Sequence, residues 1–60
     1  MKPKDLMKVL ADDGWVVVSI QGSHYIHKHP TKSGTIPVAL HSKDMAPGTL
    51  NKILKAAGLK

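Results

Sequence analysis

Two short stretches near the ends of the chain repeat apolar residues at the spacing of one helix face. The repeat i, i+3, i+4, i+7 occurs first in Pro3, Leu6, Met7 and Leu10 and again in Leu50, Ile53, Leu54 and Ala57. This spacing is typical of an amphipathic helix that buries one side. Pro3 and Pro47 suit a first helical turn, and Gly14 and Gly58 suit the left-handed position that ends a helix. We therefore expect one helix from Pro3 to Asp13 and a second that Pro47 opens and Gly58 ends.

Three segments between these helices have the composition of β-strands. Trp15–Ile20 is valine-rich, and both of its alternating faces are largely apolar, which favours a central or well-covered strand. Gln21-Gly22 is a turn signal before a second strand at His24–Lys28. Pro30–Gly34 has loop chemistry and precedes a third strand at Thr35–Leu40.

The order α-β-β-β-α predicts an α+β fold, a two-layer sandwich with both helices on one face of a three-stranded antiparallel sheet. A meander places the third strand at an edge, which suits Pro37 because proline cannot donate to a β-ladder. The other face of the sheet is left for solvent or a partner. This order, in a chain of 60 residues, resembles the double-stranded-RNA-binding (dsRBD) fold, and we expect a single domain over residues 1–60.

Composition excludes several classes of protein. The chain has no cysteine, which removes disulfides, zinc-thiolate sites and cysteine nucleophiles. Its apolar runs are too short to span a membrane, and no apolar segment follows a charged start as in a secretory signal. We therefore expect a cytoplasmic protein.

The net charge of +5 is unevenly placed. Three lysines and three aspartates balance within residues 1–13, whereas residues 14–60 hold six lysines, one aspartate and all four histidines. This asymmetry favours an anion-binding face, such as one for nucleic acid.

The tripeptide Gly22-Ser23-His24 is the strongest candidate for chemistry, since it places an imidazole at the start of a strand. Imidazole takes or gives a proton near neutral pH. On RNA, a neutral His24 can deprotonate the 2′-hydroxyl, which then attacks the adjacent phosphorus and leaves a 2′,3′-cyclic phosphate without a metal or cofactor. The alternative is a turn histidine that only hydrogen-bonds the backbone.

Several short motifs together resemble the HicA toxin family, the small messenger-RNA-cleaving toxins of bacterial and archaeal toxin–antitoxin pairs. These motifs are Gly14-Trp15, Gly22-Ser23-His24, His29-Pro30, Pro47-Gly48-Thr49-Leu50, Ile53-Leu54 and Ala57-Gly58-Leu59. The resemblance covers nearly the whole chain and implies the dsRBD-like fold, an endoribonuclease (mRNA interferase) activity and His24 as the single catalytic histidine. It also implies a HicB-type antitoxin, expected to cover His24 or the RNA face with an acidic surface. Tyr25 stands where many members have a second histidine.

Substrate contacts are expected around His24. Gly22 and Ser23 would shape the site, and Lys28 would hold the RNA backbone from the same strand. Lys43 lies just before the last helix, whose N-terminal amides favour an anion. The chain has lysine but no arginine. Its basic side chains therefore offer a phosphate a single point charge rather than the bidentate hydrogen bonds of a guanidinium.

The other histidines leave alternatives open. His27 and His29 share one strand face, opposite His24, and such a pair can bind zinc, but it lacks further ligands unless His41 folds nearby. We therefore expect no metal site, and we expect these side chains to be exposed or in contact with RNA. The general acid stays open among His27, His29, His41, Tyr25 and nearby lysines.

Two further classes of function compete with an enzyme. A non-catalytic RNA-binding module fits the fold and charge equally well, although the two-residue turn at Gln21-Gly22 and the helix start at Pro47 disfavour double-stranded RNA. A protein adaptor that uses an exposed sheet edge is weakened by Pro37 and the surplus lysines. For Trp15, a core position is favoured over base stacking.

Overall fold

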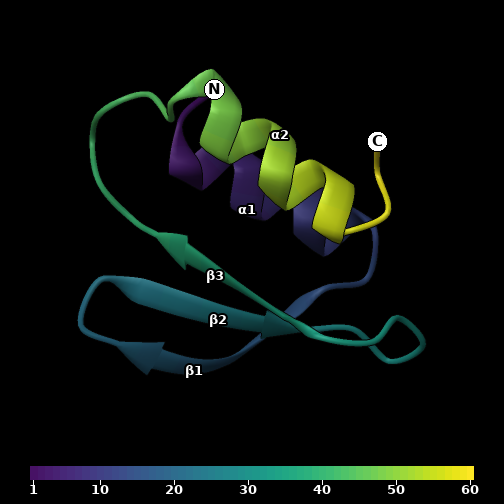
Figure 1. Ribbon diagram of the computed structural model, residues 1–60. Helices are drawn as coiled ribbons and strands as arrows, with labels where there is room; N and C mark the ends of the chain where they lie inside the picture. Colours follow the sequence, from purple (N-terminus) through teal and green to yellow (C-terminus); the bar gives the residue numbers. More distant parts are fainter.

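The computed structural model describes all of residues 1–60, and Figure 1 shows two helices packed in one layer and a three-stranded sheet in the other. The elements in chain order are α1 (Pro3–Asp12), β1 (Val16–Gln21), β2 (His24–Lys28), β3 (Thr35–Ala39) and α2 (Pro47–Ala56). The α+β order expected from the sequence is confirmed. The bounds differ from the expected ones by one or two residues, and those of β2 agree.

Both helices end by the same hydrogen-bonded motif. After α1, Gly14 adopts φ +103°, and the Trp15 N–H donates back to the Leu10 carbonyl at 2.9 Å. The final turn of α2 closes in the same way around Gly58, which has φ +75°. A Schellman motif of this kind satisfies carbonyls that a helix end leaves unpaired, so each glycine ends its helix as expected.

The sheet is an antiparallel meander in the order β1-β2-β3. Gln21 pairs with His24, so the tight turn is Gly22-Ser23, one residue later than the sequence signal suggested. Its positive φ lies at Gly22, the first central position, as a type II′ hairpin requires. Pro37 lies in β3, an edge strand, as its missing N–H predicted.

The core lies between the helices and β3. It contains six buried apolar residues, namely Leu6, Leu10, Trp15, Ile36, Val38 and Ala57. Partly buried side chains from α1, α2 and the segment before α2 pack around them. The position of Trp15 is therefore structural, as favoured from the sequence.

The expectation that the first strand is central or well covered is wrong. β1 is an edge strand, and all six of its residues are exposed, including Ile20 at 58% and Val16 at 55%. In Figure 1 the helices lie nearest β3, and β1 is the strand farthest from them. β1 therefore has two apolar faces, and the helices of this chain do not cover it.

The expectation that His27 is exposed or contacts RNA is also wrong. Its side chain is 2% exposed, and Nδ1 lies 3.2 Å from the Ile36 carbonyl and 2.9 Å from the Tyr25 carbonyl. The ladder pairs His27 with Ile36, a core residue, so the imidazole faces the helices. A buried polar group requires such a partner, and His27 is a core histidine.

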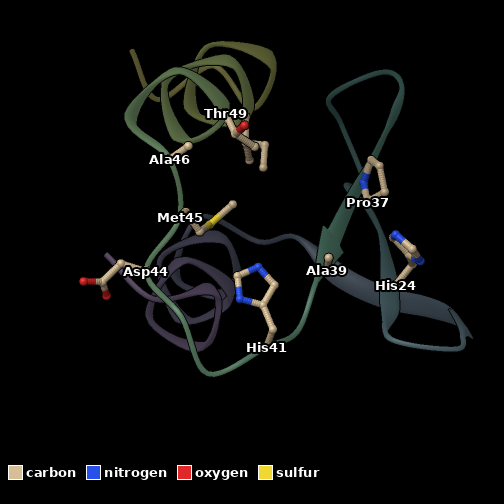
Figure 2. Close-up of a pocket in the computed structure, with 9 residues that line it drawn as sticks. His24, Pro37, Ala39, His41, Asp44, Met45, Ala46 and Thr49 are labelled. Carbon is tan, nitrogen blue, oxygen red and sulfur yellow. The ribbon is translucent and has the colours of Figure 1, made fainter.

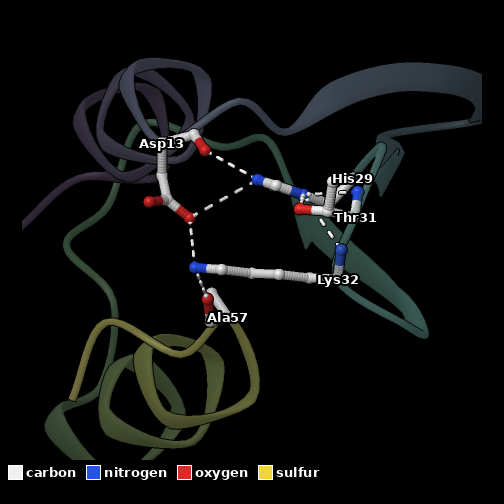
Figure 3. A network of polar contacts seen from close by, with 5 residues as sticks. All are labelled: Asp13, His29, Thr31, Lys32 and Ala57. Atoms are coloured by element: carbon white, nitrogen blue, oxygen red, sulfur yellow. Dashed lines mark hydrogen bonds and ion pairs between the residues drawn. The ribbon is translucent and has the colours of Figure 1, made fainter.

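A polar cluster ties the β2–β3 loop to the ends of both helices (Figure 3). Lys32 Nζ donates to Asp13 Oδ2 at 2.6 Å and to the Ala57 carbonyl at 2.9 Å. The hydrogen bond and the charge of Lys32 hold the pKa of Asp13 below its ordinary value of 3.8, against a smaller opposing effect of desolvation. This cluster joins three segments that are distant in sequence.

His29 belongs to the same cluster and is not a free surface histidine. Nε2 donates to the Asp13 carbonyl at 2.7 Å, while Nδ1 accepts from the backbone N–H groups of Thr31 and Lys32, each at 3.1 Å. The ring also packs edge-on against Trp15, with centroids 5.2 Å apart. The expected exposure of His29 is therefore corrected, because both of its nitrogens are engaged in holding the loop.

Candidate active site

One pocket, with a volume of about 360 Å³, opens between the end of the β2–β3 ladder and the start of α2 (Figure 2). Its lining residues are His24, Pro37, Ala39, His41, Asp44, Met45, Ala46, Thr49 and Ile53. The lining combines two imidazoles with small and apolar side chains. A pocket with a few convergent polar groups is the usual form of a site for ligands or catalysis.

His24 is exposed and occupies the first position of β2. It pairs with Gln21 on one side and Ala39 on the other, so both neighbouring strands hold its backbone. The preceding turn is open at Gly22, where an added Cβ would meet no atom within 4 Å. The imidazole is thus accessible on a rigid support and belongs to the pocket.

His41 enters the same pocket from the segment that follows β3. The Leu40 N–H donates to the Ser23 carbonyl at 2.8 Å, which continues the pairing one residue beyond the last ladder position. The residues that follow these two partners in the chain are His41 and His24. Sequence reasoning left His41 as one of several general-acid candidates, and the structure brings it to the pocket that His24 lines.

The segment between His41 and α2 is fixed at its other end as well. The Met45 N–H donates to the Met1 carbonyl at 2.9 Å, and Met45 packs against the core. Ala46 is the N-cap of α2 and supplies no side-chain hydrogen bond to the first turn. Helix N–H groups at the pocket wall therefore have no side-chain cap, and such groups favour anions.

The expected substrate contacts are spread around the pocket rather than gathered in it. Gly22 and Ser23 form the turn just before His24, and Lys43 lies between two residues that line the pocket. Lys28 is exposed at the opposite end of β2. By strand alternation Lys28 lies on the same face as His24, about 13 Å away at roughly 3.3 Å per residue.

The remaining candidates lie elsewhere. His27 is in the core, His29 holds the β2–β3 loop, and Tyr25 is half-buried on the alternate side of β2 from His24. No three His, Cys, Asp or Glu side chains gather closely enough to hold a metal ion. Neither helix has the length and apolar character needed to cross a membrane. The register of the strands decides which of the histidines are buried, and the spacing of the histidines in the sequence does not reveal that register.

Comparison with known proteins supplies one match. The family model described as "HicA toxin of bacterial toxin-antitoxin" matches residues 3–59, nearly the whole chain. No individual curated protein matches the sequence significantly. The matched range includes both helices, the sheet and every residue that lines the pocket.

Proposed function

The chain belongs to the HicA toxin family of bacterial toxin–antitoxin systems, and on that premise we propose that it is an endoribonuclease that cuts messenger RNA with His24 as general base. The observation that carries this proposal is the exposed imidazole of His24, held at the start of a paired strand and open to a pocket. A structural histidine is buried and bonded, as His27 is in the same strand.

In the proposed reaction, neutral His24 accepts the proton of the ribose 2′-hydroxyl. The 2′-oxygen forms a bond to the adjacent phosphorus, and the bond from phosphorus to the 5′-oxygen breaks. The departing 5′-oxygen takes up a proton, so the products are a 2′,3′-cyclic phosphate and a 5′-hydroxyl end. Every atom of the nucleophile comes from the RNA, so the protein needs only proton transfer and charge stabilisation, and His24 supplies the proton transfer at the 2′-hydroxyl.

Charge stabilisation is assigned to groups around the pocket. The uncapped N–H groups at the start of α2 and the nearby Lys43 would attract the scissile phosphate. Lys28 would hold a neighbouring phosphate along the open face of the sheet. The net charge of +5 favours binding of a polyanion throughout.

Family membership implies an antitoxin partner. We propose a HicB-type protein whose acidic surface covers His24 and the basic surface around it, which would exclude RNA. Binding to the folded chain would also stabilise it, since a partner that binds only the native state shifts the folding equilibrium.

The test is incubation of the purified protein with a labelled single-stranded RNA in the presence of EDTA. We expect cleavage with 2′,3′-cyclic phosphate ends, and a loss of about 100-fold or more in rate for His24→Ala. Gln21→Ala is the matched control, because Gln21 is exposed, pairs with His24 and does not line the pocket. Intact RNA despite salt-sensitive binding would instead favour the non-catalytic RNA-binding module, and equal rates for native protein and His24→Ala would remove His24 from the mechanism.

A further inference from the structure

We propose that His41 is a second catalytic residue, the general acid that gives a proton to the departing 5′-oxygen. The inference rests on the proposed ribonuclease function and adds a partner to His24. Breaking the bond from phosphorus to the 5′-oxygen creates an alkoxide, which is a poor leaving group unless it is protonated as it departs. A single base at the 2′-hydroxyl leaves that requirement unmet.

The backbone places the two imidazoles at one site. His24 pairs with Ala39, and His41 follows Ala39 by two residues, beyond the hydrogen bond of 2.8 Å that joins Leu40 to Ser23. His41 lies just beyond the regular ladder, where the bond from Leu40 to Ser23 still keeps the chain beside the start of β2. Both histidines line the pocket of about 360 Å³, and Figure 2 shows their rings on either side of Ala39.

This arrangement suits a phosphate held between the rings. In-line attack places the entering 2′-oxygen and the leaving 5′-oxygen on opposite sides of the phosphorus. Each oxygen then needs its own proton-transfer group within roughly 2.6–3.2 Å. Two imidazoles that line one pocket from different segments of the chain supply one such group for each oxygen.

The positions of the other two histidines remove them as candidates for the acid. The imidazole of His27 is buried against the Ile36 carbonyl, and both nitrogens of His29 are engaged in the β2–β3 loop. Asp44 lines the pocket, but Figure 2 shows its carboxylate directed away from both imidazoles. Apart from His24, which serves as the base, His41 is the one imidazole that lines the pocket, and its side chain is exposed.

The step accepts one proton and donates one. His24 begins neutral and gains the 2′-hydroxyl proton, while His41 begins protonated and gives its proton to the 5′-oxygen. After the cut His24 is charged and His41 is neutral. Both side chains are exposed, so exchange with water restores the starting states.

The test compares two short RNAs that differ in one atom. The first has an ordinary scissile linkage, and in the second a sulfur replaces the bridging 5′-oxygen. A thiolate leaves without protonation, so the second RNA needs no general acid. We expect His41→Ala to cut the oxygen RNA about 100-fold more slowly than the native protein and the sulfur RNA within about fivefold of it. His24→Ala should be slow on both, because the base is needed in either case.

Ser42→Ala is the matched control, since Ser42 is exposed beside His41 and does not line the pocket. An oxygen RNA cut at the native rate by His41→Ala would overturn this inference and leave the ribonuclease function standing. Equal slowing of both RNAs would also overturn it, because it assigns His41 to binding. If the native protein cuts neither RNA, the proposed function fails and this inference fails with it.

Discussion

Two histidines of β2, three residues apart, should respond to substitution in opposite ways. His27 is 2% exposed, and its Nδ1 lies 3.2 Å from the Ile36 carbonyl. His24 is exposed and lines the pocket. Replacing each by alanine therefore separates a side chain that supports the core from one that is free for chemistry.

The cost of His27→Ala follows from its burial. Losing the hydrogen bond removes about 1 kcal/mol, and the vacated space adds a cavity and transfer cost. The total is about 2–4 kcal/mol, since imidazole is smaller and more polar than the core side chains whose truncation costs up to about 5 kcal/mol. A chain of 60 residues has a free energy of unfolding of roughly 3–9 kcal/mol. The change should therefore lower Tm by roughly 10–30 °C.

Thermal and urea unfolding followed by circular dichroism measure this difference. His24→Ala should change the free energy of unfolding by no more than about 0.5 kcal/mol. His27→Gln is the conservative variant, and because its amide can still donate to the Ile36 carbonyl it should recover about 1 kcal/mol. A Tm for His27→Ala within about 3 °C of the native value would refute the reasoning, because loss of a buried, hydrogen-bonded side chain should lower the free energy of unfolding by more than such a shift represents.

Three other predictions concern the end of α1, the stability at low pH and the exposed strand β1. Gly14→Ala should lose about 2 kcal/mol or more in thermal unfolding, because φ is +103° and the new Cβ would lie 2.9 Å from a histidine ring nitrogen. Gly22→Ala has open space around it and should lose only about 1 kcal/mol, so equal losses would contradict the predicted clash. The lowered pKa of Asp13 means that its stabilising contribution is present above pH 3.8 and is lost as pH falls through the folded-state pKa. In urea unfolding across that pH range, the free energy of unfolding of Asp13→Asn should therefore depend less on pH than that of the native protein. An unchanged pH dependence would remove the ion pair from the explanation. Ile20→Thr should leave the free energy of unfolding within about 0.5 kcal/mol of native, whereas a loss near 2 kcal/mol would show that β1 is covered in solution.

Local patterns predicted the elements of this fold well. The proline and glycine positions at both helices, and the strand His24–Lys28, were correct because they depend on backbone chemistry within a few residues. Burial was predicted less well. β1 has two apolar faces but lies at an edge away from the helices, since side-chain alternation carries no information on which strand the helices cover.

The candidate site shows the same division. His24 was proposed from its motif, and the structure shows it exposed at the pocket, while its catalytic role stays a prediction. The burial of His27 depends on pairing with Ile36, across a loop whose length does not determine register. The place of His41 beside the same pocket depends on the bond between Leu40 and Ser23, which no spacing in the sequence shows.

The hydrogen bond between Met45 and Met1 has a practical consequence for anyone who labels this molecule. Met45 lines the pocket, and its N–H is held by the first residue of the chain at 2.9 Å. Figure 1 places the N-terminus beside the start of α2 and the C-terminus beyond its other end. A fluorophore attached before Met1 would therefore lie close to the pocket, whereas a tag after Lys60 would lie at the far end of α2 and suit immobilisation on a sensor surface.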